Sequence, residues 1–425
     1  MVILHLNLLE LYYYQNSCVL SFNKKIIFAT LNKIMKRIIG ILSLLFLNLD
    51  LSAQIETSEL VGGDVLNTIT TAVPFLLIGP DSRSGAMGDV GAATSPDAYS
   101  LHWNPAKFAF ADNDLEMSVS YVPWLRALVP DINLSYIGGY KKLNENEAIG
   151  VELRYFSLGD ITFTNITGDI VGQFKPNEFA VGTAYSRKLS DIFALAISGR
   201  YIYSNLTGGQ NVGEVATKPG QSFAADLAGF YEKPIRISGK DIDFALGMNI
   251  SNIGSKVSYS ETSIKDFIPI NLKIGTAIGT DIDDYNKLSL AFDINKLLVP
   301  TPPEYASDGS NDIISGKDPD VAVVSGIFQS FNDAPGGFNE EMREINYSVG
   351  TEYWYNNQFA IRAGYFSEHD TKGGRKFFTF GSGVKYNVFI IDFSYLVNAS
   401  RSINGNNPLS NTMRFSMTWN FGASE

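Results

Sequence analysis

The chain has 425 residues, of which 12% are aromatic and 18% charged, and its net charge is −11 at pH 7. This acidic balance argues against nucleic acid as a partner, because phosphate binding requires an excess of basic residues. Beyond residue 53 there is no cysteine and no apolar run of the roughly 18 residues that a membrane-spanning helix needs, which excludes disulfides, thiol chemistry and helical spans.

A secretion signal begins well inside the sequence. A basic start at residues 35–37 is followed by an apolar run and a small-residue exit, which predicts a signal peptide over 35–53, cleaved after Ala53. Residues 1–34, which hold the only cysteine, Cys18, are interpreted as upstream sequence with a mistaken start, and a genuine extension is the alternative. Loss of both parts removes five basic and two acidic residues and changes the net charge from −11 to −14.

Residues 54–113 differ in sequence pattern from the rest of the chain. They contain the glycine-rich run 85–91 and the string His102-Trp103-Asn104-Pro105-Ala106, without regular alternation of apolar and polar residues. Such alternation is the mark of a half-buried strand. This segment is therefore predicted to be separate from the strands that follow it.

From Leu115 to Phe421, large apolar residues alternate with small or polar ones in about fourteen stretches. A strand of this kind has two faces in different surroundings, and the last stretch ends in an aromatic residue, as outer-membrane barrel proteins usually do. The pattern predicts an all-β fold over 114–421, a transmembrane antiparallel β-barrel of about 14 strands. The predicted outward-facing sets are Leu115/Met117/Val119/Tyr121, Ile132/Leu134/Tyr136, Ile149/Val151/Leu153/Tyr155, Phe179/Val181/Tyr185, Phe193/Leu195/Ile197/Tyr201, Phe223/Ala225/Leu227/Tyr231, Phe244/Leu246/Met248/Ile250, Ile270/Leu272/Ile274, Leu288/Leu290/Phe292/Ile294, Ile345/Tyr347/Val349/Tyr353, Phe359/Ile361/Tyr365, Phe378/Phe380/Val384/Tyr386, Phe389/Ile391/Phe393/Tyr395 and Phe415/Met417/Trp419/Phe421.

Charged residues occupy many of the positions between the apolar ones. A charged group is almost never fully buried without a partner, so the inner face of the predicted barrel has to be wet or laced with ion pairs. We expect these charges to form a structural network in the lumen, and a solute pathway is the alternative. They are Glu152, Arg154, Arg200, Asp226, Asp293, Glu352, Arg362, Asp392 and Arg414.

The connections between the predicted strands alternate between long and short, as in bacterial outer-membrane barrels, whose long loops are extracellular. The longest connection runs from Pro300 to Met342. With an even number of strands, both chain ends are expected in the periplasm. A large soluble β-sandwich or propeller is the alternative fold, but a single core does not explain two distinct faces on these strands.

Two of the predicted extracellular loops are unusually apolar. The first contains Trp124, Leu125 and Leu128, and the longest contains Ile327, Phe328, Phe331 and Phe338. Exposed apolar patches usually mark contact surfaces, so these residues are candidates for binding a partner or substrate. Alternatively, the two loops pack on one another as a lid.

The sequence offers little for catalysis or metal binding. A Ser-His-Asp triad needs a histidine that is oriented by an acid and touches a nucleophile, whereas His369 is expected at a loop tip. His102 is expected to pack or to form a hydrogen bond beside Trp103. The run that begins at Asp308 lacks the glycine at the sixth position and the glutamate at the twelfth position of a calcium loop. No metal, cofactor or catalytic residue is therefore predicted.

The run 85–91 followed by Trp103-Asn104-Pro105-Ala106, ahead of a fourteen-strand pattern, resembles the N-terminal hatch of the FadL-type outer-membrane transporter superfamily. The resemblance implies that residues 54–113 form a hatch inside the barrel, with Trp103, Asn104, Pro105 and Ala106 among its residues. Longer strings resemble the PorV family of type IX secretion proteins over about Asn67 to Phe421. They are Thr70–Ile78, Pro80–Arg83, Tyr155–Phe163 and Gln173–Phe179.

The second resemblance implies an outer-membrane shuttle that receives substrates bearing a C-terminal signal domain at the translocon barrel (SprA/Sov) and passes them to the attachment proteins PorU, PorQ and PorZ. A FadL-like passive transporter of hydrophobic small molecules is the alternative. A transporter needs an apolar ligand cavity, whereas the predicted inner positions are mainly charged or small. Lipopolysaccharide deacylation, a third possibility, needs a catalytic histidine on the outer surface of the barrel, and neither histidine is expected there.

Overall fold

The computed structural model describes residues 66–126, 129, 131–164, 167–209, 216–237, 239–260, 265–308, 310–399, 409 and 411–422. The upstream stretch 1–34, the predicted signal peptide at 35–53 and the beginning of the predicted hatch lie outside the described residues, as does Leu128. Within the described part of the chain, no helix is both long and apolar enough to span a membrane.

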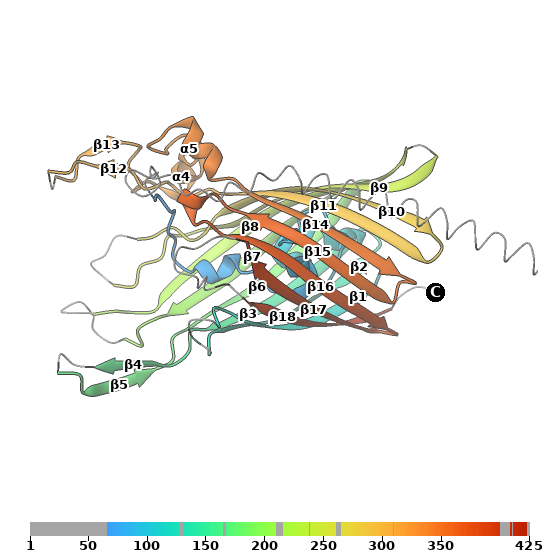
Figure 1. The fold of residues 1–425 in the computed structure, drawn as a ribbon, viewed down its shortest axis with the longest axis horizontal. Helices are drawn as coiled ribbons and strands as arrows, with labels where there is room; N and C mark the ends of the chain where they lie inside the picture. Colours follow the sequence, from blue (N-terminus) through green and yellow to red (C-terminus); the bar gives the residue numbers. More distant parts are fainter. Residues whose placement is uncertain are drawn as a thin grey trace, which may run out of the picture. The chain divides into compact units, whose positions relative to one another are not determined.

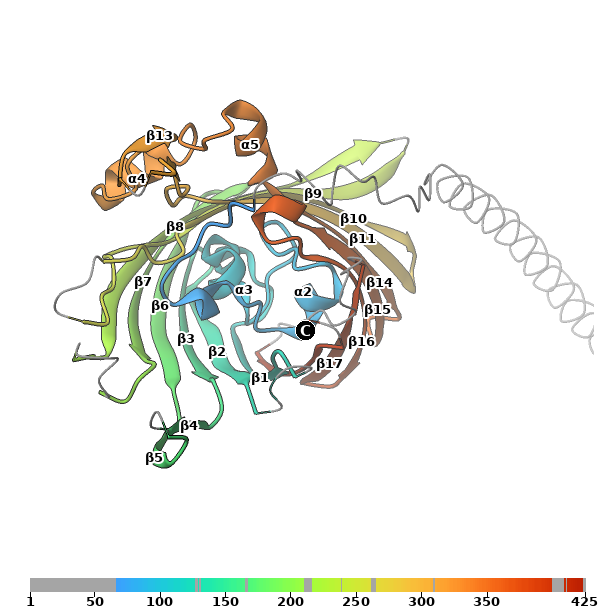
Figure 2. The same ribbon diagram turned by 60° about the vertical axis from the view of Figure 1, so that its left-hand side comes forward.

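The predicted barrel is confirmed. Fourteen antiparallel strands close into a ring, in which the first strand pairs with the last (Figures 1 and 2). The other neighbours in the ring follow one another along the chain. The strands are β1 (Leu115–Pro123), β2 (Asn133–Asn144), β3 (Glu147–Ser157), β6 (Asn177–Ser190), β7 (Phe193–Asn205), β8 (Gly220–Ile237), β9 (Lys240–Gly254), β10 (Asn271–Asp283), β11 (Asn286–Leu297), β14 (Asn346–Tyr355), β15 (Phe359–Ser367), β16 (Lys376–Tyr386), β17 (Phe389–Asn398) and β18 (Met413–Phe421).

Long and short connections alternate around the ring, as predicted. Two of the long connections carry small sheets of their own, each with two strands. The long connection between β11 and β14 also holds two helices (Figure 1). The elements in the long connections are β4 (Ile161–Thr164) with β5 (Ile170–Phe174), β12 (Glu304–Tyr305) with β13 (Ile313–Ser315), α4 (Val323–Gln329), α5 (Phe338–Arg343) and the 3-10 helix η4 (Asp370–Lys372).

The two faces of the wall differ as the alternation predicts. On β3, Val151 is 58% exposed, whereas the next residue, Glu152, is 3% exposed and lies on the lumen side. Closure of the ring pairs the backbone groups of every strand, which the hydrocarbon core of a membrane requires. The chain is therefore an outer-membrane type of barrel, with an apolar belt outside and polar groups inside.

The predicted register of β2 is wrong. Leu134 and Tyr136, which the alternation assigns to the outer face, are buried in the lumen, and Ile137 is 53% exposed outside. Tyr136 packs on Tyr99, with 5.3 Å between the ring centroids. An aromatic residue on the inner face therefore has a partner inside the barrel, and the local pattern of the strand does not reveal it.

Residues 66–112, called the hatch below, occupy the lumen, and Figure 2 shows α2 and α3 surrounded by the strands. Hatch and wall share several hydrophobic clusters, one of which joins Phe108 to Tyr140 of β2 and Ala184 of β6. The hatch elements are η2 (Pro74–Leu77), α2 (Ser82–Ala86), α3 (Ser100–Trp103) and η3 (Pro105–Phe110).

The hatch runs lengthwise through the barrel. Near its beginning, the N–H of Asn67 donates to the carbonyl of Thr371, in a long connection, at 3.0 Å. Near its end, the carbonyl of Ala111 accepts a bond of 3.0 Å from Lys142, beside a short turn. The end of β18 lies on the short-turn side, as expected, whereas the first described residues of the hatch lie at the opposite end of the barrel. The chain end before residue 66 lies outside the described residues.

Candidate functional site

Asn104 fastens the hatch to the barrel wall. Its Oδ1 accepts a bond of 3.0 Å from the N–H of Ala106 and caps η3, where Pro105 has no N–H that needs a partner. Its Nδ2 donates to the carbonyls of Ala92, at 2.8 Å, and of Gly229 in β8, at 3.0 Å. One fully buried amide thus joins two parts of the hatch to a strand.

Trp103 joins the hatch to itself and to β9. Its indole N–H donates to Asp81 at 2.7 Å, and its carbonyl accepts a bond of 3.1 Å from Asn249. Gly91 lies so close to the indole that any Cβ there would clash with the ring, which gives a physical reason for a glycine at that position. His102 packs edge-on against the same ring, with 4.4 Å between the centroids, as a packing residue does.

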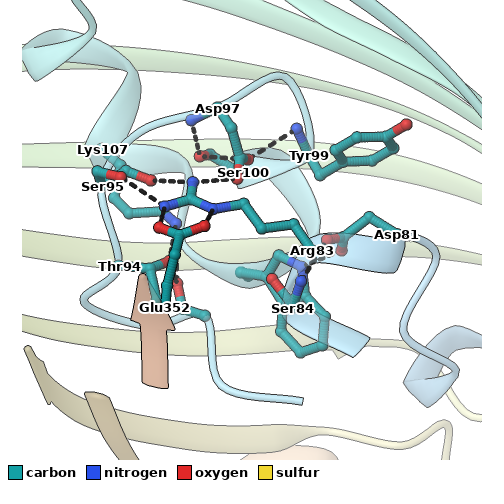
Figure 3. A network of polar contacts seen from close by, with 12 residues as sticks. Asp81, Arg83, Ser84, Thr94, Ser95, Asp97, Tyr99, Ser100, Lys107 and Glu352 are labelled. Atoms are coloured by element: carbon teal, nitrogen blue, oxygen red, sulfur yellow. Dashed lines mark hydrogen bonds and ion pairs between the residues drawn. The ribbon is translucent and has the colours of Figure 1, made fainter. Parts of the chain in front are cut away.

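An ion-pair network joins α2 to the wall. The guanidinium of Arg83 lies between the carboxylates of Glu352, at 2.8 Å, and Asp97, at 2.9 Å, and also donates to Ser95 (Figure 3). Glu352 of β14 pairs in turn with Arg362 of β15 at 2.6 Å. A buried charge is costly unless it is paired and hydrogen-bonded, so these contacts fix the position of the hatch helix.

A second network contains the other predicted inward charges of β3, β7 and β8. Arg200 pairs with Glu152 at 2.9 Å and with Asp226 at 3.1 Å. Arg154 pairs with Glu152 at 2.8 Å and donates to the carbonyl of Leu76 in the hatch at 3.0 Å. The predicted structural network is therefore confirmed. The remaining charges are bonded as well, in the pairs Arg362 with Asp392, Arg414 with Asp89, and Asp293 with the backbone N–H groups of Gly91 and Ala92.

Lys107 is a hatch residue that the sequence did not single out. Its side chain is fully buried, and its ammonium donates to the carbonyl of Gly91 at 2.9 Å and to the hydroxyl of Thr94 at 3.1 Å. The only local signal is its place directly after the Asn-Pro-Ala string, within an otherwise apolar stretch. The sequence indicates Asp81 and Arg83 only through the family resemblance, because their partners Trp103 and Glu352 lie 22 and 269 residues away.

A cavity of about 650 Å³ lies between the hatch and the mouth of the barrel on the long-loop side. Its lining combines charged groups with a wall of large apolar side chains. The expectation that the inner positions are mainly charged or small is therefore incomplete. The apolar lining comes from the hatch, from the mouth ends of the strands and from the long connections, including the first loop. The apolar lining includes Trp124, Phe156, Phe366, Phe377, Leu396 and Leu409.

The predicted contact residues fall into two groups. Trp124 and Leu125 are partly buried and pack on a cluster that contains Phe366 and Leu409. Both residues line the cavity on its loop side. The first loop therefore lies over the barrel mouth, on residues of β15, β16 and β17 and on Leu409. The residues of the longest loop differ, because three of its four predicted contact residues are exposed.

Residues 300–344 form the long-loop lobe. Internal bonds hold it together, including one of 2.8 Å between Gln329 and the carbonyl of Asp318. Phe328 and Phe338 are 73% and 76% exposed, and Phe331 is 49% exposed, whereas Ile327 packs on the core. The lobe has nine acidic and two basic residues. Its exposed carboxylates are Glu304, Asp308, Asp312, Asp318 and Asp320.

The predicted non-catalytic positions have ordinary structural contacts. His369 caps η4 and accepts a bond from the N–H of Thr371, and the neighbouring Glu368 pairs with Arg375 at 2.8 Å. Asp308 caps a turn by accepting from the N–H of Ser310 at 2.9 Å. Among the residues that the structure describes, no three His, Cys, Asp or Glu side chains are grouped so as to hold a metal ion.

Residues 63–304, more than half of the chain, match the family described as Type IX secretion system protein PorV. Solved structures with a similar fold include the Pseudomonas putida toluene transporter TodX, at 13% identity and a TM-score of 0.47, which covers 81% of this chain and 99% of that one. The Ralstonia pickettii toluene transporter TbuX has 13% identity and a TM-score of 0.43, and the match covers 81% of this chain and 98% of that one. A Pseudomonas aeruginosa FadL homologue has 11% identity and a TM-score of 0.37, and the match covers 84% of this chain and 99% of that one. No curated protein sequence matches the chain.

Proposed function

The chain belongs to the PorV family of type IX secretion system proteins, and from this membership we propose that it is a binding and transfer component of that system in the outer membrane. In this role it binds substrates with a C-terminal signal domain at the translocon barrel and passes them to the attachment complex. Its partners are then the SprA/Sov translocon, the cargo proteins, the attachment proteins PorU, PorQ and PorZ, and the surrounding lipid.

The observation that carries the proposal is the long-loop lobe. Phe328 and Phe338 expose about three quarters of their surface, at 73% and 76%, although large aromatic side chains gain free energy when a partner covers them. Aromatic residues commonly anchor protein interfaces. Figures 1 and 2 show α4 and α5 at the long-loop end and to one side of the ring, where a neighbour in the membrane or a protein at the surface can reach them.

The packed hatch supports a role through surfaces and not through the lumen. Asn104, Arg83 and Arg154 each tie the hatch to the wall or to another part of itself by buried polar contacts. Passage of a polypeptide through the lumen would require all these contacts to break together. Binding at the exposed lobe requires none of them to break.

The FadL-like transporter remains the second candidate, because of the cavity. Its volume of about 650 Å³ lies within the range of small-molecule sites, and part of its lining is aromatic. In this alternative Trp124 and Leu125 act as the roof of a ligand site, and the exposed lobe has no role.

The two candidates are separated by a triple variant, Phe328→Ser, Phe331→Ser and Phe338→Ser. A matched control, Ile161→Ser with Ile170→Ser, removes exposed apolar residues from another long connection. We expect the triple variant to insert as a heat-modifiable barrel but to lose cargo with the C-terminal signal from the cell surface, and the control to secrete normally. Normal secretion by the triple variant, with slower uptake of hydrophobic compounds after Trp124→Ser, would support the transporter instead.

A further inference from the structure

A buried cluster of ions at the mouth of the barrel has no part in the contacts described so far. It consists of Lys296 at the end of β11, Lys372 in η4, and Glu340, Glu341 and Glu344 in or next to α5. Together with Asn67 these residues are called the mouth latch.

The contacts of the mouth latch are short. Lys372 pairs with Glu340 at 2.6 Å and with Glu344 at 3.0 Å, and Lys296 pairs with Glu344 at 2.6 Å and with Glu341 at 3.1 Å. The side chains of Lys372 and Glu344 are 4% and 1% exposed. When an ion pair is shielded from water to this degree, removing one partner is strongly destabilising, because it leaves an uncompensated buried charge.

The hatch is bound into this cluster. The side-chain amide of Asn67 donates to Glu340 at 3.0 Å and to the carbonyl of Pro302 at 3.1 Å. Its backbone N–H donates to the carbonyl of Thr371, which precedes Lys372. The first described residues of the hatch are therefore held by the long-loop lobe and by the connection between β15 and β16 at once.

The same short helix carries both the latch and an exposed aromatic residue. Phe338 is the first residue of α5, and Glu340 and Glu341 are its third and fourth residues. Phe331 also touches the latch, with the ammonium of Lys296 5.9 Å from its ring centroid. A partner that covers Phe331 and Phe338 therefore contacts α5 and the ring beside Lys296 directly, and any shift of α5 moves the carboxylates that hold Lys372 and Asn67.

We propose that the mouth latch couples occupation of the long-loop lobe to the hold on the hatch. With the lobe free, the ion pairs of α5 keep the hatch in place beneath the mouth. With the lobe occupied, α5 shifts, Glu340 leaves Asn67, and the hatch segment that begins at Asn67 is released toward the mouth. The occupant of the lobe rests on the proposed function, whereas the latch itself rests on the contacts given above.

The test uses a thiol reporter in the full-length protein, which lacks other cysteines beyond the predicted upstream stretch. Ala72 is 7% exposed in the hatch, so a cysteine placed there reacts with a membrane-impermeant maleimide only when the segment lifts. The Ala72→Cys protein is compared with added Lys372→Met and added Lys376→Met. Lys376 lies near Lys372 and pairs with Asp370 at 2.7 Å, outside the latch, so it is the matched control.

In purified protein in lipid vesicles, we expect Lys372→Met to raise the labelling rate about tenfold or more and Lys376→Met to leave it unchanged. In secreting cells, we expect Ala72→Cys to label faster than in vesicles, and Phe338→Ser to bring the cellular rate back to the vesicle rate. Equal labelling of the Lys372→Met and Lys376→Met proteins overturns the latch. A loss of secretion in Phe338→Ser without any change in cellular labelling overturns the coupling and leaves the proposed function standing. Normal secretion by the Phe338→Ser protein, with its cellular labelling rate lowered to the vesicle rate, overturns the proposed function alone.

Discussion

The indole N–H of Trp103 donates a hydrogen bond of 2.7 Å to the carboxylate of Asp81, and this one contact joins the end of α3 to the cap of α2. The second carboxylate oxygen of Asp81 accepts from the N–H of Ser84, also at 2.7 Å. Both residues are buried, so neither oxygen can replace its donor with bulk water.

Replacing Trp103 with Phe should therefore loosen the hatch without emptying its core. The variant keeps an aromatic ring but leaves one oxygen of Asp81 buried and without a donor, at an expected cost of about 1–3 kcal/mol. Hydrogen exchange of the amides in residues 81–110 measures the effect. Trp419→Phe, on the outer face of β18, is the control and should leave hatch protection unchanged.

The corrected register of β2 gives a test in which both variants lie on one strand. Ile137→Arg places a charge on the outer face in the middle of β2, and we expect a cost of about 2–4 kcal/mol if the position lies near the midplane. Leu143→Arg, also exposed on the outside but next to the short turn, should cost roughly 0–1 kcal/mol. The measurement is reversible unfolding in lipid vesicles, and equal costs would contradict this placement of the strand.

Buried and exposed ion pairs should differ in their effect on the hatch. Arg83→Met leaves Asp97 without its guanidinium partner and Glu352 with one of two, and we expect the hatch to lose about 3–5 kcal/mol of stability. Arg187→Met breaks only the exposed pair with Glu147 and should cost about 0–1 kcal/mol. Protease protection of the hatch in solubilised protein reports the difference. Similar cleavage of both variants would mean that the buried network does not hold the hatch.

The stability of the long-loop lobe should depend on pH through the ionisation of Asp333. Burial, together with the negative charges of Glu341 and Glu344, raises the pKa of Asp333 to about 6. Because its pKa in the folded lobe is higher than the ordinary value of 3.8, the folded lobe favours the protonated form, so stability is greatest below about pH 4 and falls as pH rises through 6. Asp333→Asn keeps an acceptor for the N–H of Thr301 and should remove this part of the pH dependence.

The Asp333→Asn test compares the two proteins at each pH, so that the pH dependence of the probe itself cancels. Protection of α4 and α5 against proteolysis should be similar for both proteins at pH 4 and greater for the variant at pH 7. A parent protein whose lobe becomes more protected between pH 4 and 7, relative to the variant, would contradict the assignment.

The barrel could be predicted from the sequence because lipid acts on every strand in the same way. Residues such as Val151 and Phe415 recur with a period of two wherever one face meets hydrocarbon. The prediction failed on β2, where Tyr136 faces inward to meet Tyr99 and leaves Ile137 as the clearest outward residue. Both aromatic residues of β2, Tyr136 and Tyr140, face the lumen, so hydrophobicity alone does not choose the register.

The hatch contacts and the mouth latch could not be predicted in the same way. Asn104 bonds to Gly229, and Asn67 bonds to Glu340, over separations of 125 and 273 residues. No local period relates such residues, and their proximity follows only from the closed ring and from the path of the hatch within it. The sequence marked the Asn-Pro-Ala string through a family resemblance and gave no sign of the latch.

The seam between β1 and β18 has a consequence for biogenesis. These strands are the first and last of the barrel, so the wall remains an open sheet until the end of the chain is available. The hatch precedes β1 and can settle against this open sheet, whereas entry into a finished cylinder would draw Trp103 and Phe108 past the side chains that later enclose them. The chain order therefore favours a barrel that closes around its own plug as the final step of insertion.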